Sequence, residues 1–299
     1  MKIKDLHALT PVEFHNGIHF KRDDLFRPFT DIGVSGGKVR QCLLLVRKHL
    51  RDIKRTHGGT IATACSVHSP QGVIVARVAK KYGLKCLIGC GTAKPMTHAA
   101  LRQCKVLGAE IKTLVTSNAY TAVLESRLDR LRKSTEFFPI RFGYQAETDG
   151  DAIIEPNAAQ VQNIPDQVTA LVVPVGSAVS AHGILVGVER YRPNLTVYLI
   201  QPFGYSRTLA IPPTVKAHYL TGKYPYSTLM NITIGSFQLD QIYEAKAYHY
   251  MQRHLKSILR REVVCFWVIG DANWLRAWAP AGHDRTRSPI QADDSSLKE

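Results

Sequence analysis

Short apolar runs alternate with amphipathic segments along most of the chain. The apolar runs are bounded by glycine or polar residues and predict buried strands at residues 60–64, 84–88, 111–115, 169–175, 195–200 and 262–269. Apolar residues at helical spacing predict helices at residues 42–57, 72–82, 95–108, 118–133 and 239–260, and one more that starts near Ala181. Strands and helices that alternate in this way predict parallel α/β sheets, with ligand-binding loops at the carboxyl ends of the strands.

The helix predicted over residues 42–57 has two contrasting faces. One face is apolar and is expected to contact the core through Leu43, Val46, Leu50 and Ile53. The other face carries a basic stripe made of Arg47, Arg51, Lys54 and Arg55. Such a stripe is typical either of a solvated helix surface or of a surface that contacts phosphate groups.

Three segments lack a regular pattern. Residues 143–166 are polar and are expected to cross between two domains, whereas residues 202–238, rich in Pro, Gly, Tyr and Thr, give no ordered prediction. Residues 281–299 are polar and are expected to be a disordered tail. The expected organisation is a larger domain of residues 1–41 and 151–280 and a smaller α/β domain of residues 42–150.

Length and charge narrow the classes of protein to which the chain can belong. Its 299 residues, 45% of them hydrophobic, are enough for a large core and two domains. The formal net charge of +15 predicts a polyanionic partner, with nucleic acid ahead of a membrane surface; the alternative is a merely basic, well-solvated surface. No run of 18 apolar residues occurs, and residues 1–5 do not begin a signal peptide, so we expect a soluble, cytoplasmic protein.

Six cysteines are scattered through the chain without a Cys-x-x-Cys pair. Cys86 and Cys90 fall in an apolar run, where they are expected in the core rather than at a zinc ion. We therefore expect no metal site, and free thiols in a reducing compartment.

The sequence Ser-Gly-Gly-Lys at residues 35–38 carries the first candidate chemistry. Its two glycines permit positive φ and the close approach of a bulky, flat ligand. Lys38 is expected at a helix N-terminus, where positive potential and burial favour the neutral amine that attacks carbonyl groups. A phosphate loop is one alternative, but its glycine spacing is missing and Val39 replaces the required hydroxyl residue. A plain turn with a solvated lysine is another.

The surrounding residues favour the first interpretation. Lys-Arg-Asp-Asp at residues 21–24 and Gly-Gly-Lys-Val-Arg at residues 36–40 resemble the lysine segment of pyridoxal-phosphate enzymes of fold type II, nearest to the branch of 1-aminocyclopropane-1-carboxylate deaminase and D-cysteine desulfhydrase. The resemblance implies a two-domain α/β fold, with parallel twisted sheets flanked by helices and pyridoxal 5′-phosphate in the cleft between the domains. It implies that Lys38 binds the cofactor covalently and then acts as acid and base at Cα. Members of this family are commonly dimers, so a homodimer is expected.

A second motif lies at residues 239–246, Leu-Asp-Gln-Ile-Tyr-Glu-Ala-Lys. It resembles the Asp-Pro-Val-Tyr-Glu-Gly-Lys motif of the deaminase branch, with Gln241 in place of the proline. The resemblance implies that Tyr243 takes part in proton transfer and that Glu244 pairs with the pyridine nitrogen of the cofactor. An acidic partner there keeps the ring protonated and makes it a better electron sink. The alternative is an ordinary helix start with a glutamate in its first turn.

Two further segments resemble the family less closely. Residues 66–71, Ser-Val-His-Ser-Pro-Gln, fall on the family's Gln-Ser-Asn-Gln loop, which implies proton transfer by Ser69 and cofactor binding by Gln71. The turn after the strand at 169–175 resembles the family's phosphate-binding turn, which implies phosphate binding by the backbone amides of Gly176, Ser177, Ala178, Val179 and Ser180. His68 and His182 lie beside these segments, and single histidines in such places are more often structural.

The chain departs from the family pattern at both of these segments. Pro70 occupies the asparagine position and has no N–H, so the loop loses donors that grip the substrate carboxylate in the family. Ala178 and Val179 stand where glycines are usual, and the β-branched Val179 is expected to restrict the backbone.

These departures and the charge lead to one functional hypothesis. Without its donors, the carboxylate can swing out of plane and be lost as carbon dioxide. We hypothesise a lyase that decarboxylates an amino acid attached to a thymidine base in DNA, as in viral hypermodification of thymidine. The basic stripe is then expected to contact the DNA phosphates. The alternatives are a deaminase or desulfhydrase acting on a free small amino acid, and a non-catalytic relative that binds nucleic acid.

Overall fold

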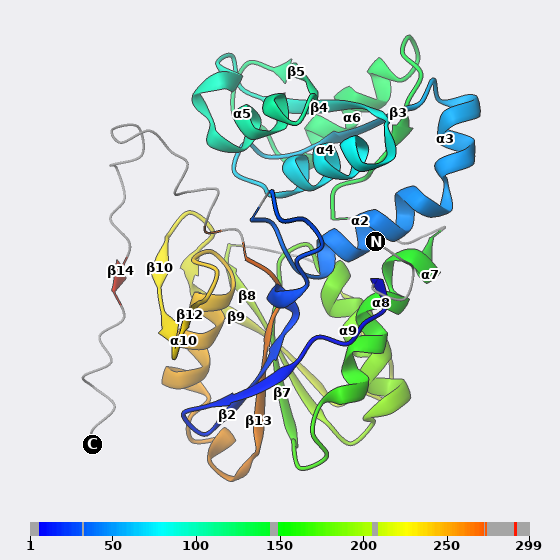
Figure 1. The fold of residues 1–299 in the computed structure, drawn as a ribbon. Helices are drawn as coiled ribbons and strands as arrows, with labels where there is room; N and C mark the ends of the chain where they lie inside the picture. Colours follow the sequence, from blue (N-terminus) through cyan, green and yellow to red (C-terminus); the bar gives the residue numbers. More distant parts are fainter. Residues whose placement is uncertain are drawn as a thin grey trace.

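The structure is a computed structural model that describes residues 6–31, 33–143, 149–204, 209–271, 273 and 290–291. It contains two large sheets, each covered by helices on both faces (Figure 1). The smaller of the two lies in the upper part of the molecule in Figure 1 and the larger below it, and α2 (Gly37–Lys48) runs between them. This architecture confirms the predicted α/β class.

The smaller sheet has four parallel strands in the order β5–β4–β3–β6. They span Glu110–Val115 (β5), Lys85–Gly91 (β4), Thr60–Ala64 (β3) and Phe138–Pro139 (β6). The sequence pattern predicted the first three but not β6, since two residues are too few to show a period. Because all four strands run in one direction, the loops that follow them meet at one edge of the sheet.

Side chains alternate between the two faces of this smaller sheet. Ile88 belongs to the core that contains α4 (Gln71–Tyr82) and α5 (Ala99–Val106). The preceding residue, Leu87, packs on the opposite face with α6 (Thr121–Leu131). The sheet therefore has a separate apolar core on each side.

The larger sheet has six strands in the order β1–β2–β13–β7–β8–β9, and β1 alone among them is antiparallel to its neighbour. They span Val12–His15 (β1), Ile18–Arg22 (β2), Val264–Val268 (β13), Ala170–Pro174 (β7), Thr196–Phe203 (β8) and Ala217–Pro225 (β9). Asn16 and Gly17 connect β1 to β2 with φ of 50° and 80°. Asn-Gly is the pair that such two-residue hairpin turns favour.

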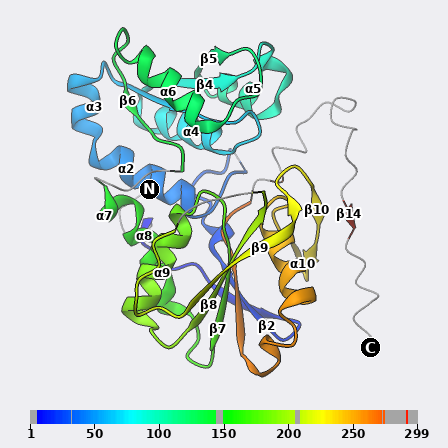
Figure 2. The ribbon, with the colours of Figure 1, turned by 180° about the vertical axis from the view of Figure 1, so that it is seen from behind.

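Helices cover both faces of the larger sheet (Figure 2). Val172 in β7 packs with α10 (Glu244–His254) on one face. Its neighbour Val173 packs with α9 (Val179–Tyr191) and η3 (Ala159–Asn163) on the other. The carboxyl ends of β7, β8 and β13 are therefore framed by two helices.

The remaining elements are short. The helical ones are η1 (Asp23–Leu25), η2 (Pro95–Thr97), α7 (Gly150–Ile153), α8 (Glu155–Ala158) and η4 (Leu259–Arg261). The strands are β10 (Met230–Asn231), β11 (Thr233–Ile234), β12 (Phe237–Gln238) and β14 (Ile290–Gln291). The segment at residues 143–166, for which the sequence predicted no regular structure, thus includes α7, α8 and η3.

The helix predicted over residues 42–57 is wrong in its bounds. The chain forms α2 from Gly37 and then breaks at His49 (φ −96°, ψ 7°) before α3 (Leu50–Thr56). The predicted boundary between residues 41 and 42 falls inside α2, and the division into two domains stays a prediction. The expected disordered tail lies outside the described residues, apart from β14.

All six cysteines are buried with free thiols, as predicted. Burial raises the pKa of Cys65 and of Cys265 to about 12, so both thiols stay protonated and unreactive at neutral pH. Within the described ranges, no helix is both long and apolar enough to span a membrane.

Candidate active site

Lys38 is the second residue of α2, at the end of this helix that adjoins the segments following β13 and β3. Its amine lies 5.8 Å from the centroid of the Phe142 ring. Burial lowers the pKa of Lys38 to about 8, although Asp240 and Cys65 favour its charged form. More of this amine is therefore neutral at physiological pH than in a solvated lysine, as a nucleophilic amine requires.

The two glycines before Lys38 are required by the protein's own packing. Gly36 has φ 93°, and a Cβ there would lie 2.1 Å from the carbonyl oxygen of Ile269. A Cβ on Gly37 would lie 2.8 Å from the side-chain oxygen of Asn157, and the Gly37 N–H donates to the Ile269 carbonyl at 3.2 Å. The expected positive φ is confirmed at Gly36, where the turn after β13 fills the space of a side chain, and the approach of a flat ligand to these glycines stays a prediction.

Glu244 contacts the same turn from the start of α10. Its Oε1 accepts hydrogen bonds from the N–H groups of Ile269 (2.8 Å) and Gly270 (3.0 Å), and its Oε2 accepts one from Asp240 (3.0 Å). Three of the roughly four acceptor positions of the carboxylate are filled, which leaves one for a ligand. Burial, with repulsion from Asp240, raises the pKa of Glu244 well above its ordinary value. The helix of Lys38 and the side chain of Glu244 therefore converge on residues 269–270.

The same contacts hold the turn that leads into α10, whose N-cap residue is Tyr243. The Oδ1 atom of Asp240 accepts hydrogen bonds from the N–H groups of Ile242 (2.9 Å) and Tyr243 (3.0 Å), while Glu244 accepts the N–H of Asp240. This reciprocal arrangement resembles a capping box. The interpretation of residues 239–246 as a helix start therefore has structural support, and the cap also fixes the direction of Tyr243.

Tyr243 lies over the turn that follows β7. A Cβ on Gly176 would lie 3.1 Å from two carbons of the Tyr243 ring. Tyr226, which sequence analysis did not single out, packs edge-on against the same ring at 5.7 Å. The buried amine of Lys246 donates to the carbonyl groups of Pro225 (2.7 Å) and Tyr226 (3.1 Å) and so fixes the segment that carries Tyr226. No motif in the sequence indicated Tyr226, because its partner is 17 residues away in an irregular segment.

The turn at residues 176–180 has the features of a phosphate site. It ends in α9, whose first N–H groups have no partner within the helix. In the described part of the chain, the buried hydroxyl of Ser180 has no hydrogen-bond partner. A phosphate at this turn would satisfy both sets of donors, so the residues present fit the phosphate of pyridoxal phosphate. The backbone strain falls on Ala178 (φ 68°) and not on Val179 as expected, because Val179 is helical.

The loop after β3 uses its own backbone donors. The N–H of Ser69 donates to the carbonyl of Ser66 (2.9 Å), and the N–H of Gln71 donates to the hydroxyl of Ser69 (3.2 Å). Pro70, the N-cap of α4, has no N–H. The N–H groups of Ser69 and Gln71 are therefore used within the loop, and Pro70 has none.

Gln71 is fully buried and its side chain is engaged within the protein. Its amide nitrogen donates to the Thr63 hydroxyl (2.8 Å) and the Arg141 carbonyl (3.1 Å), and its oxygen accepts the N–H of Gly143 (2.9 Å). Gly143 in turn adjoins the phosphate turn, since a Cβ there would lie 2.7 Å from Cβ of Ser177. Gln71 thus joins the loop after β3 to that turn, and its direct contact with the cofactor stays a prediction.

The basic stripe lies away from these residues. Arg51, Lys54 and Arg55 are exposed on α3, and Arg47 is half-buried on α2. Arg47 follows Lys38 by two and a half turns of α2, roughly 14 Å at 1.5 Å per residue, and the other three lie on α3 beyond the break at His49. The structure does not bring the basic stripe to Lys38, so only an extended ligand can contact both.

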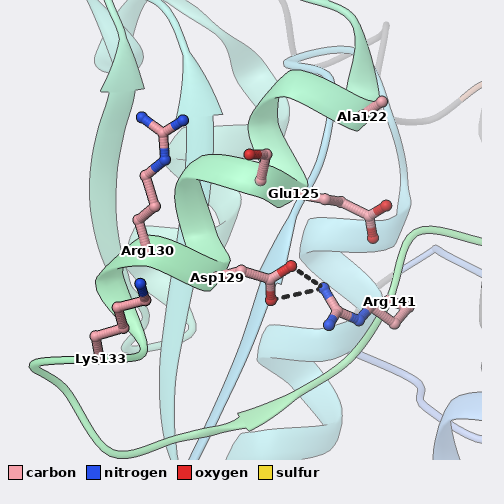
Figure 3. Close-up of a pocket in the computed structure, with 7 residues that line it drawn as sticks. Ala122, Glu125, Asp129, Arg130, Lys133 and Arg141 are labelled. Carbon is pink, nitrogen blue, oxygen red and sulfur yellow. Dashed lines mark hydrogen bonds and ion pairs between the residues drawn. The ribbon is translucent and has the colours of Figure 1, made fainter.

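A hollow of about 550 Å³ lies along α6 and not at Lys38 (Figure 3). Asp129 in its wall holds Arg141 through both carboxylate oxygens, at 2.8 and 2.9 Å. Glu125 accepts the N–H of Phe142 at 2.7 Å. The walls of the hollow thus position the segment that packs beside the Lys38 amine, and we assign the hollow no chemistry of its own.

Known proteins resemble this chain in sequence. The family described as pyridoxal-phosphate dependent enzyme matches residues 3–253. The O-seryl-dTMP PLP-dependent decarboxylase of Salmonella phage ViI is 28% identical over 211 residues, which are 63% of this chain and 47% of that protein. The chain thus spans about half the length of the curated relative it matches.

Solved structures share its fold. A homologue of ACC deaminase superposes with a TM-score of 0.71 at 16% identity, covering 91% of this chain and 94% of the other. The O-acetylserine-dependent cystathionine β-synthase of Helicobacter pylori superposes with a TM-score of 0.63 at 17% identity, covering 91% and 96%. At these identities the likeness concerns the fold alone.

Proposed function

The chain belongs to the pyridoxal-phosphate-dependent enzymes and has their fold type II, and on this premise we propose that it decarboxylates an amino acid attached to a thymidine base in DNA. The relative from Salmonella phage ViI, an O-seryl-dTMP decarboxylase, supports a nucleotide-linked substrate. The net charge of +15 supports a substrate that carries phosphates.

The observation that carries the proposal is the missing carboxylate anchor after β3. The family resemblance implies that amides of this loop hold the substrate carboxylate in the plane of the cofactor ring. Here Pro70 has no N–H, and the N–H groups of Ser69 and Gln71 are used within the loop. Without that anchor, the bond between Cα and the carboxyl carbon would be free to take the orientation in which the bound cofactor best stabilises the electron pair left at Cα.

The residues present would hold pyridoxal phosphate at three points. Lys38 would bind its aldehyde carbon, and the remaining acceptor position of Glu244 would face its ring nitrogen. The amides of residues 176–180 and the Ser180 hydroxyl would bind its phosphate. A positively charged ring nitrogen would favour the ionised form of Glu244 and oppose the effect of burial.

Bound pyridoxal phosphate supplies an electron-withdrawing ring that stabilises an electron pair at Cα. In the proposed reaction the bond between Cα and the carboxyl carbon breaks, carbon dioxide leaves, and Cα gains one proton. The amine of Lys38, with a pKa of about 8, is suited to hold that proton and deliver it. Ser69 and Tyr243 are proposed to carry protons beside it.

A deaminase or desulfhydrase that acts on a free small amino acid is the second candidate. The retained Tyr243 and Ser69 favour it, because the resemblance assigns proton transfer in the deaminase branch to these two side chains. The two candidates differ in the bond that is broken and in the product that leaves.

The test is to supply the protein with pyridoxal phosphate and then with serine linked to thymidine in a DNA oligonucleotide. We expect the nucleoside to lose one carbon dioxide by mass, and we expect Lys38→Ala to abolish the loss. Free serine, D-cysteine and 1-aminocyclopropane-1-carboxylate serve as parallel substrates. Release of ammonia or sulfide from these, with the DNA unchanged, would establish the second candidate instead.

A further inference from the structure

His68 and His98 pack edge to face at the carboxyl edge of the smaller sheet. Their ring centroids are 5.7 Å apart and their planes meet at 83°. His68 follows β3 and His98 follows β4, and these strands are adjacent and parallel. The pair therefore lies at the edge where open parallel sheets bind ligands.

The turn that carries His98 is held by hydrogen bonds. Nη1 of Arg102 donates to the carbonyl groups of Met96 (3.1 Å) and Thr97 (3.0 Å). The hydroxyl of Thr97 donates to the carbonyl of Lys94 (2.8 Å). His98 is thus presented from a fixed turn, in which the side chain of Lys94 is exposed.

His68 is exposed, whereas its neighbours Val67 and Ser69 are buried. Ser69 is the residue proposed to carry protons at the amino-acid group of the substrate. His68 is next to it in the chain and on the solvent side. His68 is therefore an exposed residue one position from Ser69, on the loop that adjoins the proposed site.

We propose that His68 and His98 form a stacking site for the pyrimidine ring of the nucleotide, and that Lys94 contacts its phosphate; this rests on the proposed function. Imidazole rings stack on nucleobases, and their N–H groups match the carbonyl acceptors of a pyrimidine. The ammonium of Lys94 adds the charge that positions a phosphate.

Other uses of the pair fit the structure less well. A metal site needs more ligands, and the described residues contain no group of three or more His, Cys, Asp or Glu side chains that could hold an ion. The hollow on α6 is lined by both signs of charge, Glu125 and Asp129 together with Arg130, Lys133 and Arg141, and it does not lie at Lys38 (Figure 3).

The test uses the protein loaded with pyridoxal phosphate, and thymidine 5′-monophosphate as the probe. His68→Ala and His98→Ala should each weaken its calorimetric Kd by about 10- to 100-fold. They should raise KM for thymidine-linked serine by the same factor, with kcat changed less than about twofold. His98→Phe should keep most of the affinity, because phenylalanine also stacks. His254→Ala is the matched control, since His254 packs on Tyr250 at 4.8 Å at the far end of α10.

The outcomes separate this inference from the proposed function. If both alanine variants bind the probe and turn over thymidine-linked serine as the wild type does, the stacking site is refuted and the decarboxylase stands. If the probe binds in a histidine-dependent way but the wild type releases no carbon dioxide from thymidine-linked serine, the decarboxylase is refuted and the stacking site stands. A probe that does not bind the wild type refutes the stacking site.

Discussion

The ring of Tyr243 packs tightly over Gly176, since a Cβ there would lie 3.1 Å from both Cε1 and Cζ. The two residues come from motifs 67 positions apart, at the start of α10 and at the end of β7. Their contact joins the residue proposed for proton transfer to the turn proposed for the phosphate. The position of the Tyr243 ring and the shape of the phosphate turn are therefore mutually dependent.

The variant Gly176→Ala tests this dependence. Its added methyl group must displace the Tyr243 ring by a few tenths of an ångström, so we expect pyridoxal phosphate to bind at least about tenfold more weakly and the protein to lose about 1 kcal/mol of stability. Absorbance titration with the cofactor and urea unfolding measure the two effects. Gly150→Ala is the control, since a Cβ there meets nothing within 4 Å. Unchanged affinity in Gly176→Ala would show that the ring moves away freely.

Ala178 offers the opposite test, a substitution that should stabilise the protein. Its φ of 68° is in the left-handed region, which costs an L-residue about 1–2 kcal/mol. Glycine removes that strain but is more flexible when unfolded, so Ala178→Gly should gain about 0.5–1 kcal/mol. Thermal unfolding of the cofactor-free protein measures the gain. A loss of stability would show that the turn relieves the strain in another way.

The sequence predicted most of the parallel strands, because each buried strand is a continuous apolar run between polar or glycine residues. It missed β9, which lies at the edge of the larger sheet and has a single buried residue, and therefore carries no such run. It also missed the break at His49, because the apolar spacing continues through it to the buried Ile53. Both errors arise because the pattern of apolar residues reports which positions are buried and does not report the backbone geometry.

The candidate site was predictable only in part, for a different reason. Lys38, Tyr243 and Glu244 lie in motifs that can be recognised locally. The reason for Gly36 is its contact with Ile269, more than two hundred residues later in the chain. Such long-range contacts leave no local signal, and the role of Asn157 beside Gly37 escaped detection for the same reason.

The pKa of Lys38 makes a prediction about stability and pH. In the folded protein it is about 8, below the 10.5 of a solvated lysine. The unfolded chain therefore binds more protons between these values, and the stability contributed by this residue rises as the pH increases from about 8 to 10.5. Lys38→Met should stabilise the cofactor-free protein at pH 7 by about 1–2 kcal/mol, because the half-buried ammonium group keeps part of its hydration. The gain should vanish by about pH 10.5.

Lys21 provides the contrast for this measurement. Burial also lowers its pKa to about 8, but its amine donates to the Thr10 carbonyl (2.7 Å) and the Asn163 side chain (2.6 Å). Lys21→Met removes the donor to the Asn163 side-chain oxygen and leaves the Thr10 carbonyl with the Asn163 N–H alone (2.7 Å), so it should destabilise the protein at pH 7. Urea unfolding at pH 7, 9 and 10.5 compares the two variants. Equal effects in both would mean that Lys38 also has a structural partner.

The basic stripe predicts how binding to DNA should depend on salt. Each phosphate contact contributes a slope of about −0.9 to log K against log salt, so removing three contacts in Arg51→Ala/Lys54→Ala/Arg55→Ala should flatten the slope by about 2.7. Arg260→Ala/Arg261→Ala, which removes two exposed cations from η4, should leave it unchanged. Fluorescence anisotropy with a labelled oligonucleotide measures both. Equal slopes for the wild type and both variants would show that the basic stripe is a solvated surface that does not contact the DNA phosphates.

The substitution Pro70→Asn should change which bond the enzyme breaks. Asparagine restores a backbone N–H and a side-chain amide at the N-cap of α4, both directed at the loop that the resemblance assigns to the carboxylate. A carboxylate held in plane is no longer oriented for loss, so we expect carbon dioxide release from thymidine-linked serine to fall at least about tenfold. Exchange of the Cα proton with deuterium should rise, because the Cα–H bond then takes the perpendicular orientation.

Two controls give that result its meaning. Pro193→Asn alters an exposed proline in the turn after α9, away from Lys38, and should leave both rates unchanged. The cofactor absorbance of Pro70→Asn should match that of the wild type, which separates a change in reaction from a loss of pyridoxal phosphate. If decarboxylation persists at the wild-type rate while cofactor binding is intact, the carboxylate is held elsewhere and the missing N–H of Pro70 does not determine the reaction. If both rates fall together, the asparagine has disturbed proton transfer at Ser69, whose hydroxyl accepts the N–H of Gln71 across this position.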